Sequence, residues 1–254
     1  ARQAARGSAF VLVMGASGSG KSSLVKAGVL AMLREAGMVG RTALVRHAIT
    51  RPGAFASPGD AIRGLAAALF AETALPELGA PPLDYTPETL GDVLRKTPED
   101  TARPIRQGLS AAGRAAGVTD QGEARLLLVI DQLEELFTAE GITPDGRACY
   151  VAALEELATS GAVWVIATMR SDFFDRLERL PALARLAGDA EYLLTPPDAA
   201  EVGQIIRQPA REAGLTFEVD ARTGRGLDDD IREAAVSNAA SLPLLEYLLD
   251  QLWH

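Results

Sequence analysis

The sequence is poor in the residues that bind metals through sulfur or nitrogen. Its 254 residues include one cysteine, Cys149, and two histidines, His47 and His254. A single cysteine excludes an internal disulfide, and three such residues argue against a four-ligand structural zinc site. We therefore expect a protein that functions in a reducing compartment, the cytoplasm.

Long hydrophobic runs are also absent. The most apolar stretches, at 10–15 and 126–130, are far shorter than the ~18 residues that a membrane span needs. Basic residues number 25 against 34 acidic residues, which gives a net charge of −9. Because such a surface repels nucleic acid and anionic lipid, we expect this chain to bind neither a membrane nor nucleic acid.

Apolar segments of strand length alternate with segments of helical periodicity. Strands are expected at 10–14, 42–49, 124–130, 162–168 and 191–194. This alternation is typical of a parallel sheet that helices cover on both faces. After Pro196 the pattern changes to helices only, at 198–207, 229–239 and 242–253. We predict an α/β domain over residues 1–195 and a small all-helical domain over residues 196–254.

The expected helices of the first domain mostly begin at capping or proline positions. They are expected at 22–36, at 60–71, from Thr86, from Thr97, from Leu133, from Thr143 to about residue 160, and as two short helices broken at Pro181. Pro104 is expected to break or kink the helix that starts near Thr97.

Segment 15–22, G-A-S-G-S-G-K-S, fits the phosphate-binding pattern G-x4-G-K-[ST]. It follows an expected strand and opens an expected helix, which argues against the alternative of a flexible turn with an unrelated lysine. Backbone N–H groups of such a loop surround a phosphate chain, Lys21 reaches the outer phosphates, and the Ser22 hydroxyl can ligate Mg²⁺. The residues that we expect to bind phosphates are Gly15, Ala16, Ser17, Gly18, Ser19, Gly20, Lys21 and Ser22.

Three carboxylates follow the third expected strand. Asp131 stands where a P-loop protein holds its Mg²⁺-coordinating carboxylate, with a helix N-cap as the alternative. Glu134 is our candidate for orienting the attacking water, and Glu135 is the second choice. The alternative for both glutamates is a position in the first turn of a helix that the helix dipole favours.

Arg170 ends the fourth expected strand. If that strand lies beside the P-loop strand, Arg170 faces the γ-phosphate and can sense or stabilise its charge. The alternative is a surface ion pair, which contributes little to stability.

Exclusions narrow the nucleotide. A guanine-specific N-K-x-D or T-K-x-D element is missing, because Asn238 is not followed by lysine and neither Lys26 nor Lys96 has aspartate two residues later. The L-S-G-G-Q stretch of ABC transporters is missing too. The expected ligands are therefore ATP or ADP with Mg²⁺.

Five segments together resemble the novel STAND NTPases, which are bacterial signal-transduction ATPases often joined to WD repeats and to an effector or kinase domain. They are 15–23, 128–137 (L-V-I-D-Q-L-E-E-L-F), 165–177 (V-I-A-T-M-R-S-D-F-F-D-R-L), 194–211 and 242–253. The resemblance implies a P-loop NTPase three-layer sandwich with a five-stranded, mostly parallel sheet in the order 5-1-4-3-2. It also adds Ser23 to the nucleotide-binding residues.

The resemblance assigns roles to three further positions. Asp131-x-x-Glu134-Glu135 is similar to the acidic Walker B motif of the related NACHT proteins, with Gln132 in place of a small residue. Arg170 matches the family's sensor arginine. Pro243 matches a proline that packs on adenine, although Ser241 replaces the glycine that usually precedes it by two residues.

The resemblance implies a slowly hydrolysing ATP switch whose nucleotide state controls conformation and assembly into a homo-oligomer. The segment that usually precedes the P-loop strand, the winged-helix domain, the sensor repeats and the effector are expected outside this chain, and His254 does not substitute for the winged-helix histidine. Three alternatives stay open: a small-molecule P-loop kinase with an acceptor pocket formed by 54–116, a fast AAA+-like motor, and a non-hydrolysing scaffold that holds ADP.

Overall fold

The computed structural model describes residues 8–35, 39–54, 60–119, 122–188, 190–237 and 242–253. The chain divides into two compact units. Unit 1 comprises Ala1–Met14 and Ser22–Leu193, and unit 2 comprises Gly15–Lys21 and Leu194–His254. The break between Leu193 and Leu194 lies close to the expected domain boundary between residues 195 and 196. Residues 15–21 of the P-loop, however, group with the C-terminal segment. The domain assignment stays a prediction.

Five strands form one sheet. They are β1 (Phe10–Gly15), β2 (Thr42–Thr50), β3 (Glu123–Ile130), β4 (Val163–Arg170) and β5 (Glu191–Leu193). The strand order is β2-β3-β4-β1-β5, which is the expected order read from the other edge. The pairs β2–β3, β3–β4 and β1–β5 run parallel. The predicted α/β fold is confirmed.

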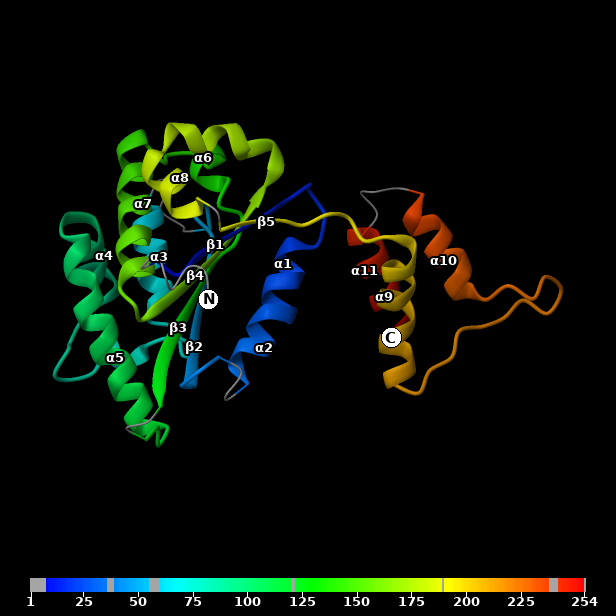
Figure 1. Ribbon diagram of the computed structural model, residues 1–254, viewed down its shortest axis with the longest axis horizontal. Helices are drawn as coiled ribbons and strands as arrows, with labels where there is room; N and C mark the ends of the chain where they lie inside the picture. Colours follow the sequence, from blue (N-terminus) through cyan, green and yellow to red (C-terminus); the bar gives the residue numbers. More distant parts are fainter. Residues whose placement is uncertain are drawn as a thin grey trace. The chain divides into compact units, whose positions relative to one another are not determined.

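Helices cover the sheet on both sides, with α1 and α2 on one side and α3, α5 and α7 on the other (Figure 1). The helical segments of unit 1 are α1 (Lys21–Ser23), the π-helical segment η2 (Leu24–Val29), α2 (Leu30–Arg34), α3 (Ala61–Leu69), η3 (Pro76–Gly79), α4 (Pro87–Lys96), η4 (Pro98–Thr101), α5 (Ala102–Ala115), α6 (Glu135–Thr138), α7 (Pro144–Thr159), η5 (Ser171–Arg179) and α8 (Pro181–Ala187). Lys21 itself groups with unit 2.

The buried strands explain the continuous apolar runs of the sequence. Residues 126–130 of β3 are fully buried, since helices on both faces leave neither side of the strand to solvent. Leu126, Leu128 and Ile130, which share one face of the strand, join one core cluster with Phe10 and Leu12 of β1 and Tyr150 of α7.

Three helix starts follow the expected capping chemistry. The side chain of Asp60 accepts a hydrogen bond from the Arg63 N–H at the start of α3, and Thr86 and Thr143 cap α4 and α7 in the same way. Each cap satisfies a backbone donor that has no partner inside its helix.

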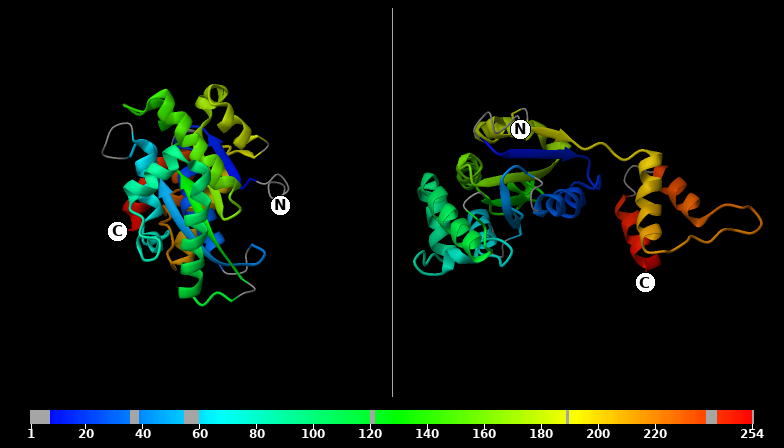
Figure 2. Two further views of the ribbon diagram at one scale, coloured as in Figure 1. Left: turned by 90° about the vertical axis from the view of Figure 1, so that its left-hand side faces the viewer. Right: turned by 60° about the horizontal axis from the view of Figure 1, so that its bottom comes forward.

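The described residues of unit 2 form three helices with a small core of their own. They are α9 (Ala199–Glu212), α10 (Leu227–Val236) and α11 (Leu242–Trp253). The core consists of Val202, Ile206, Ile231 and Leu245. The long loop between α9 and α10 extends away from these helices (Figure 2).

Several expected details are wrong. Pro104 does not break its helix, because it is the third residue of α5, in the first turn where a backbone N–H has no helical partner. The helix expected from Leu133 begins at Glu135 and has only four residues. The elements described after residue 196 are helices, as expected, and Val219 and Gly226 form one isolated antiparallel bridge between two of them. The expected end of the helix at 22–36 lies outside the described residues.

Among the described residues, no helix combines the length and the apolar character that crossing a bilayer requires.

Candidate functional site

Three glycines give the P-loop its shape. Gly18 and Gly20 have φ angles of 74° and 82°, which only glycine adopts at little cost. A Cβ atom on Gly15 would lie 2.7 Å from the Ser19 Oγ and 2.9 Å from the backbone oxygen of Leu194. The glycines of the motif are therefore required by the local backbone.

Lys21 folds back over the loop. Its ammonium group donates hydrogen bonds to the carbonyl oxygens of Gly15, at 2.9 Å, and Ala16, at 2.7 Å. The residue is 9% exposed. The one P-loop ammonium thus lies against the loop that is expected to surround the phosphates. Ala16, Ser17 and Ser23 are exposed.

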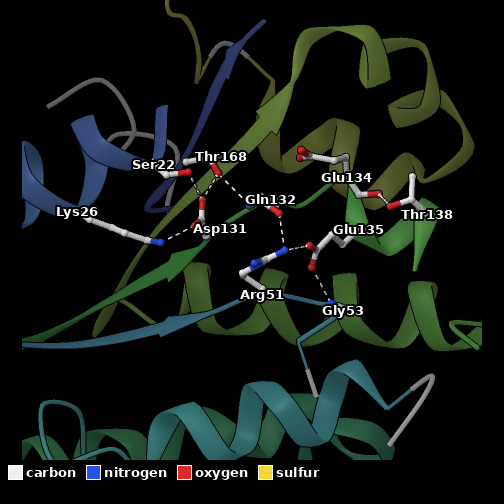
Figure 3. A network of polar contacts seen from close by, with 10 residues as sticks. All are labelled: Ser22, Lys26, Arg51, Gly53, Asp131, Gln132, Glu134, Glu135, Thr138 and Thr168. Carbon is white, nitrogen blue, oxygen red and sulfur yellow. Dashed lines mark hydrogen bonds and ion pairs between the residues drawn. The ribbon is translucent and has the colours of Figure 1, made fainter. Parts of the chain in front are cut away.

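Asp131 is the centre of a buried polar network directly after β3 (Figure 3). Its Oδ1 atom accepts hydrogen bonds from the Ser22 Oγ at 2.6 Å and the Thr168 Oγ1 at 2.8 Å. Its Oδ2 atom forms an ion pair with the Lys26 Nζ at 2.5 Å. Ser22 and Asp131, which are 109 positions apart in sequence, are therefore in direct contact.

The network keeps the Asp131 carboxylate charged although the residue is only 3% exposed. Burial raises its pKa, but the hydrogen bonds from Lys26, Ser22 and Thr168 and the charge of Lys26 outweigh burial. The pKa of Asp131 is therefore lower than its ordinary value.

Lys26 and Thr168 are members of this network that the sequence motifs did not predict. Lys26 lies four residues after Ser22, a spacing at which two residues of a helix share one face. Thr168 lies two residues before Arg170, near the end of β4. The spacing of Lys26 from Ser22 and the position of Thr168 near the end of a strand can be read from the sequence. That both side chains contact Asp131 follows only from the position of Asp131 in the fold.

Gln132 turns the chain sharply after Asp131. Its φ angle of 57° lies in the left-handed region, which costs a residue other than glycine about 1 kcal/mol. Its backbone N–H donates to the Thr168 Oγ1 at 2.9 Å, and its side chain accepts from Arg51 at 2.6 Å. These contacts hold the strained turn in place.

Glu134 and Glu135 have different surroundings. Glu134 is 7% exposed, and its Oε2 atom accepts a hydrogen bond from the Arg170 backbone N–H at 3.3 Å. Glu135 forms an ion pair with Arg51 and accepts a hydrogen bond from the Gly53 N–H at 2.9 Å. The hydrogen bond to Glu135 raises the pKa of Arg51. Glu135 is thereby bound to the loop that follows β2.

Arg170 is the last residue of β4, and β4 lies beside β1 as expected. Its guanidinium group pairs with Asp172, which raises the pKa of Arg170. The same group lies 5.6 Å from the centre of the Phe173 ring. Its role as a phosphate sensor stays a prediction.

The donor set at Asp131 fits Mg²⁺. The described residues contain no cluster of three or more His, Cys, Asp or Glu side chains that could form an all-protein metal site. Mg²⁺ is instead commonly held by one or two protein oxygens together with phosphates and water. The Ser22 hydroxyl and the Asp131 carboxylate are such oxygens, and they lie 2.6 Å apart.

The remaining expected site residue, Pro243, lies in α11 of unit 2 and is exposed. Its contact with adenine stays a prediction. Ser241 and His254 lie outside the described residues.

A P-loop between β1 and α1 of a parallel α/β sheet defines this chain as a P-loop NTPase. The chain belongs to the family described as Novel STAND NTPase 1, whose model matches residues 1–254. No curated protein matches the sequence.

Two solved structures of Aeropyrum pernix proteins have a similar fold. The ORC1 protein of Aeropyrum pernix, solved in complex with DNA, has a TM-score of 0.54 and 15% identity, and the match covers 95% of this chain and 53% of that protein. The ORC2 protein of the same organism, in ADPNP–ADP complexes, has a TM-score of 0.50 and 17% identity, with 80% and 46% coverage. At such identities the likeness concerns the fold, and this chain spans about half of each protein.

Proposed function

We propose that this chain is the Mg²⁺-dependent ATP switch of a larger bacterial signalling protein that acts in the cytoplasm. It binds ATP or ADP, hydrolyses ATP slowly, and its nucleotide state controls conformation and assembly into a homo-oligomer. Sensor and effector domains lie outside this chain. Membership of the STAND NTPase family supports this function.

The contact between Ser22 and Asp131 carries the proposal. Ser22 is the last residue of the P-loop motif, and Asp131 is the first residue of the acidic motif. Their side-chain oxygens lie 2.6 Å apart. Such a pair can hold one Mg²⁺ ion against the outer phosphates of a nucleotide, where the ion supplies positive charge.

The loop residues 15–23 bind the phosphates in this proposal. Lys21 exchanges its hydrogen bonds to Gly15 and Ala16 for phosphate oxygens. A charged hydrogen bond to phosphate is stronger than one to a neutral carbonyl, so the exchange favours nucleotide binding. In unit 2, which also contains residues 15–21, Pro243 packs on the adenine base and residues 196–254 act as a lid.

Glu134 is the residue that we assign to orienting the attacking water. Its carboxylate contacts the end of β4, the strand beside the P-loop strand. Glu135 is bound to Arg51 and Gly53 after β2, and it is better suited to fixing that loop. This difference favours Glu134 over Glu135 as the general base.

Calorimetry with ATP, ADP and GTP, each with and without Mg²⁺, tests the proposal. We expect the chain to prefer adenine nucleotides and to bind them more tightly with Mg²⁺. Lys21→Ala should weaken binding by about tenfold to a hundredfold, because it removes a charged hydrogen bond worth ~1.5–3 kcal/mol. The matched control is Lys96→Ala, which removes only an exposed ion pair with Asp92.

Two results would contradict the proposal: equal affinity of the wild type and Lys21→Ala, or wild-type binding that ignores Mg²⁺. Phosphate release under single-turnover conditions then measures the hydrolysis that we expect to be slow.

A further inference from the structure

Lys26 adds a cation that phosphate binding by the P-loop does not require. It lies in the π-helical segment Leu24–Val29, and its Nζ atom is 2.5 Å from the Asp131 Oδ2. The Lys26 side chain is 40% exposed, whereas the Asp131 side chain is 4% exposed. A partly exposed cation therefore reaches into the network from its solvent side.

A buried carboxylate is costly unless a positive charge compensates it. Ser22 and Thr168 donate hydrogen bonds to Asp131 but carry no charge. Lys26 supplies the charge, and it contacts Oδ2 while the two hydroxyl groups contact Oδ1. Lys26 therefore lies at one oxygen of the carboxylate. Ser22 and the expected Mg²⁺ site lie at the other oxygen.

A Mg²⁺ ion on the Ser22 side would place two cations against one carboxylate. Like charges a few ångströms apart repel, so each cation weakens the binding of the other. We propose that Lys26 is a built-in counter-ion of Asp131 that substitutes for Mg²⁺: without the metal it pairs with Oδ2 and holds the carboxylate in contact with Ser22, and Mg²⁺ binding weakens this ion pair. This inference rests on the proposed function, since it takes Ser22 and Asp131 as the metal ligands.

The surroundings of Lys26 leave room for its displacement. A cavity of about 260 Å³ lies beside it, lined by Lys26, Ile49, Thr50, Arg51, Ala54, Gly64 and Ala68. Arg51 on this cavity is already paired with Glu135, so its charge is compensated. The flexible four-carbon chain of lysine can move its ammonium group into this space.

The experiment compares Lys26→Met with Lys96→Met, which removes the same charge from an exposed pair with Asp92. The dissociation constant of ADP is measured by calorimetry in EDTA and in Mg²⁺. The value in EDTA divided by the value in Mg²⁺ gives a ratio that is compared among the proteins. We expect the ratio to rise about tenfold in Lys26→Met, because the carboxylate then depends on Mg²⁺ alone. It should stay unchanged in Lys96→Met and stay near the wild-type value in Lys26→Arg, which keeps the charge.

Melting temperatures in EDTA provide a second measurement. Lys26→Met should melt lower than Lys96→Met in EDTA, and Mg²⁺ with ADP should close this gap. A purely structural role would lower the melting temperature in both conditions and leave the ratio of dissociation constants unchanged. An unchanged ratio of dissociation constants overturns the proposed role of Lys26. A ratio in Lys26→Met below that of the wild type overturns it too, and so does a Lys26→Met protein that does not fold even with Mg²⁺ and ADP.

The wild type separates the two hypotheses. If Mg²⁺ strengthens ADP binding to the wild type but the ratio is the same in Lys26→Met, only the inference about Lys26 is wrong. If the wild type binds no nucleotide, or binds it equally in EDTA and Mg²⁺, the proposed function is wrong and the inference about Lys26 is overturned with it.

Discussion

Arg170 and Asp172 form a two-point ion pair at the end of β4. The Arg170 Nε lies 3.0 Å from the Asp172 Oδ1, and its Nη2 lies 2.7 Å from Oδ2. Asp172 belongs to the first turn of η5, directly after the strand. The pair uses an edge of the guanidinium, with two N–H donors, that a phosphate group could also bind. Asp172 therefore competes with any phosphate for Arg170.

This competition predicts opposite effects of two substitutions on nucleotide preference. Arg170→Ala should lower the preference for ATP over ADP about tenfold, because only ATP carries the group that Arg170 is expected to contact. Asp172→Asn should raise the preference, because it removes the competitor of the phosphate for Arg170. The rise should be only a few-fold, because an exposed ion pair contributes little energy. The measurement is the ratio of the ATP and ADP dissociation constants. An unchanged ratio in Arg170→Ala shows that Arg170 is only a surface ion-pairing residue.

The two glutamates predict separable effects on hydrolysis. Glu134→Gln should bind ATP normally and hydrolyse it on the order of 10²-fold more slowly, because the water loses its orienting carboxylate. Glu135→Gln should change the rate much less and should lower the melting temperature by weakening the contacts with Arg51 and Gly53. Single-turnover phosphate release and thermal melting separate the two effects. A slow Glu135→Gln with a normal Glu134→Gln reverses the assignment.

Two glycines predict opposite effects of the same substitution. Gly15→Ala places a Cβ atom 2.9 Å from the backbone oxygen of Leu194, which cannot move as a side chain can. We expect it to destabilise the protein by about 1–3 kcal/mol. Gly28→Ala meets only the Leu24 Cδ1 at 3.6 Å, and in a helical segment it should stabilise by about 0.5–1 kcal/mol.

Thermal melting of both glycine variants measures these shifts. For a chain of this size about 1 kcal/mol corresponds to a shift of roughly 2–4 °C. A Gly15→Ala variant that melts like the wild type would show that the backbone near Leu194 adjusts freely.

His47 predicts a pH dependence of stability. Burial, and then the positive charge of Arg34, lower the pKa of His47 below its ordinary value of 6.5. Between the lowered pKa and 6.5 the unfolded chain binds more protons than the folded one, so the contribution of His47 is present above pH 6.5 and is lost as the pH falls through that window. His47→Gln should therefore lose less melting temperature than the wild type between pH 7.5 and 5.5. Parallel losses in both proteins would contradict this interpretation.

The sequence predicted the strands well because burial on both faces leaves a plain signal. Residues 126–130 are all apolar and all buried. The P-loop was equally clear, since its glycines are required by backbone geometry that no other residue satisfies.

The polar network could not be predicted in the same way. Thr168 reaches Asp131 because β3 and β4 are neighbours in a register that pairs Ile130 with Ala167. Arg51 reaches Glu135 because β2 ends beside β3, with Thr50 paired to Ile130. These contacts follow from the alignment of the strands across the sheet, which apolar periodicity along the chain does not encode.

The hydrogen-bonding pattern of the helix after the P-loop could not be predicted from the sequence either. The periodicity of residues 22–36 predicts a helix, and a helical path is present, but residues 24–29 have π-helical hydrogen bonds. The apolar spacing of a short segment does not distinguish the two bonding patterns.

The left-handed turn at Gln132 has a consequence for how this site can vary among related proteins. A backbone in this conformation accepts glycine freely and asparagine or aspartate with little strain, but it disfavours valine, isoleucine and threonine, whose branched Cβ atoms crowd the backbone. The position after Asp131 is therefore open to a narrow set of residues for steric reasons alone. Evolutionary drift at this position should follow backbone tolerance, and a preference for small residues there needs no contact with the nucleotide to explain it.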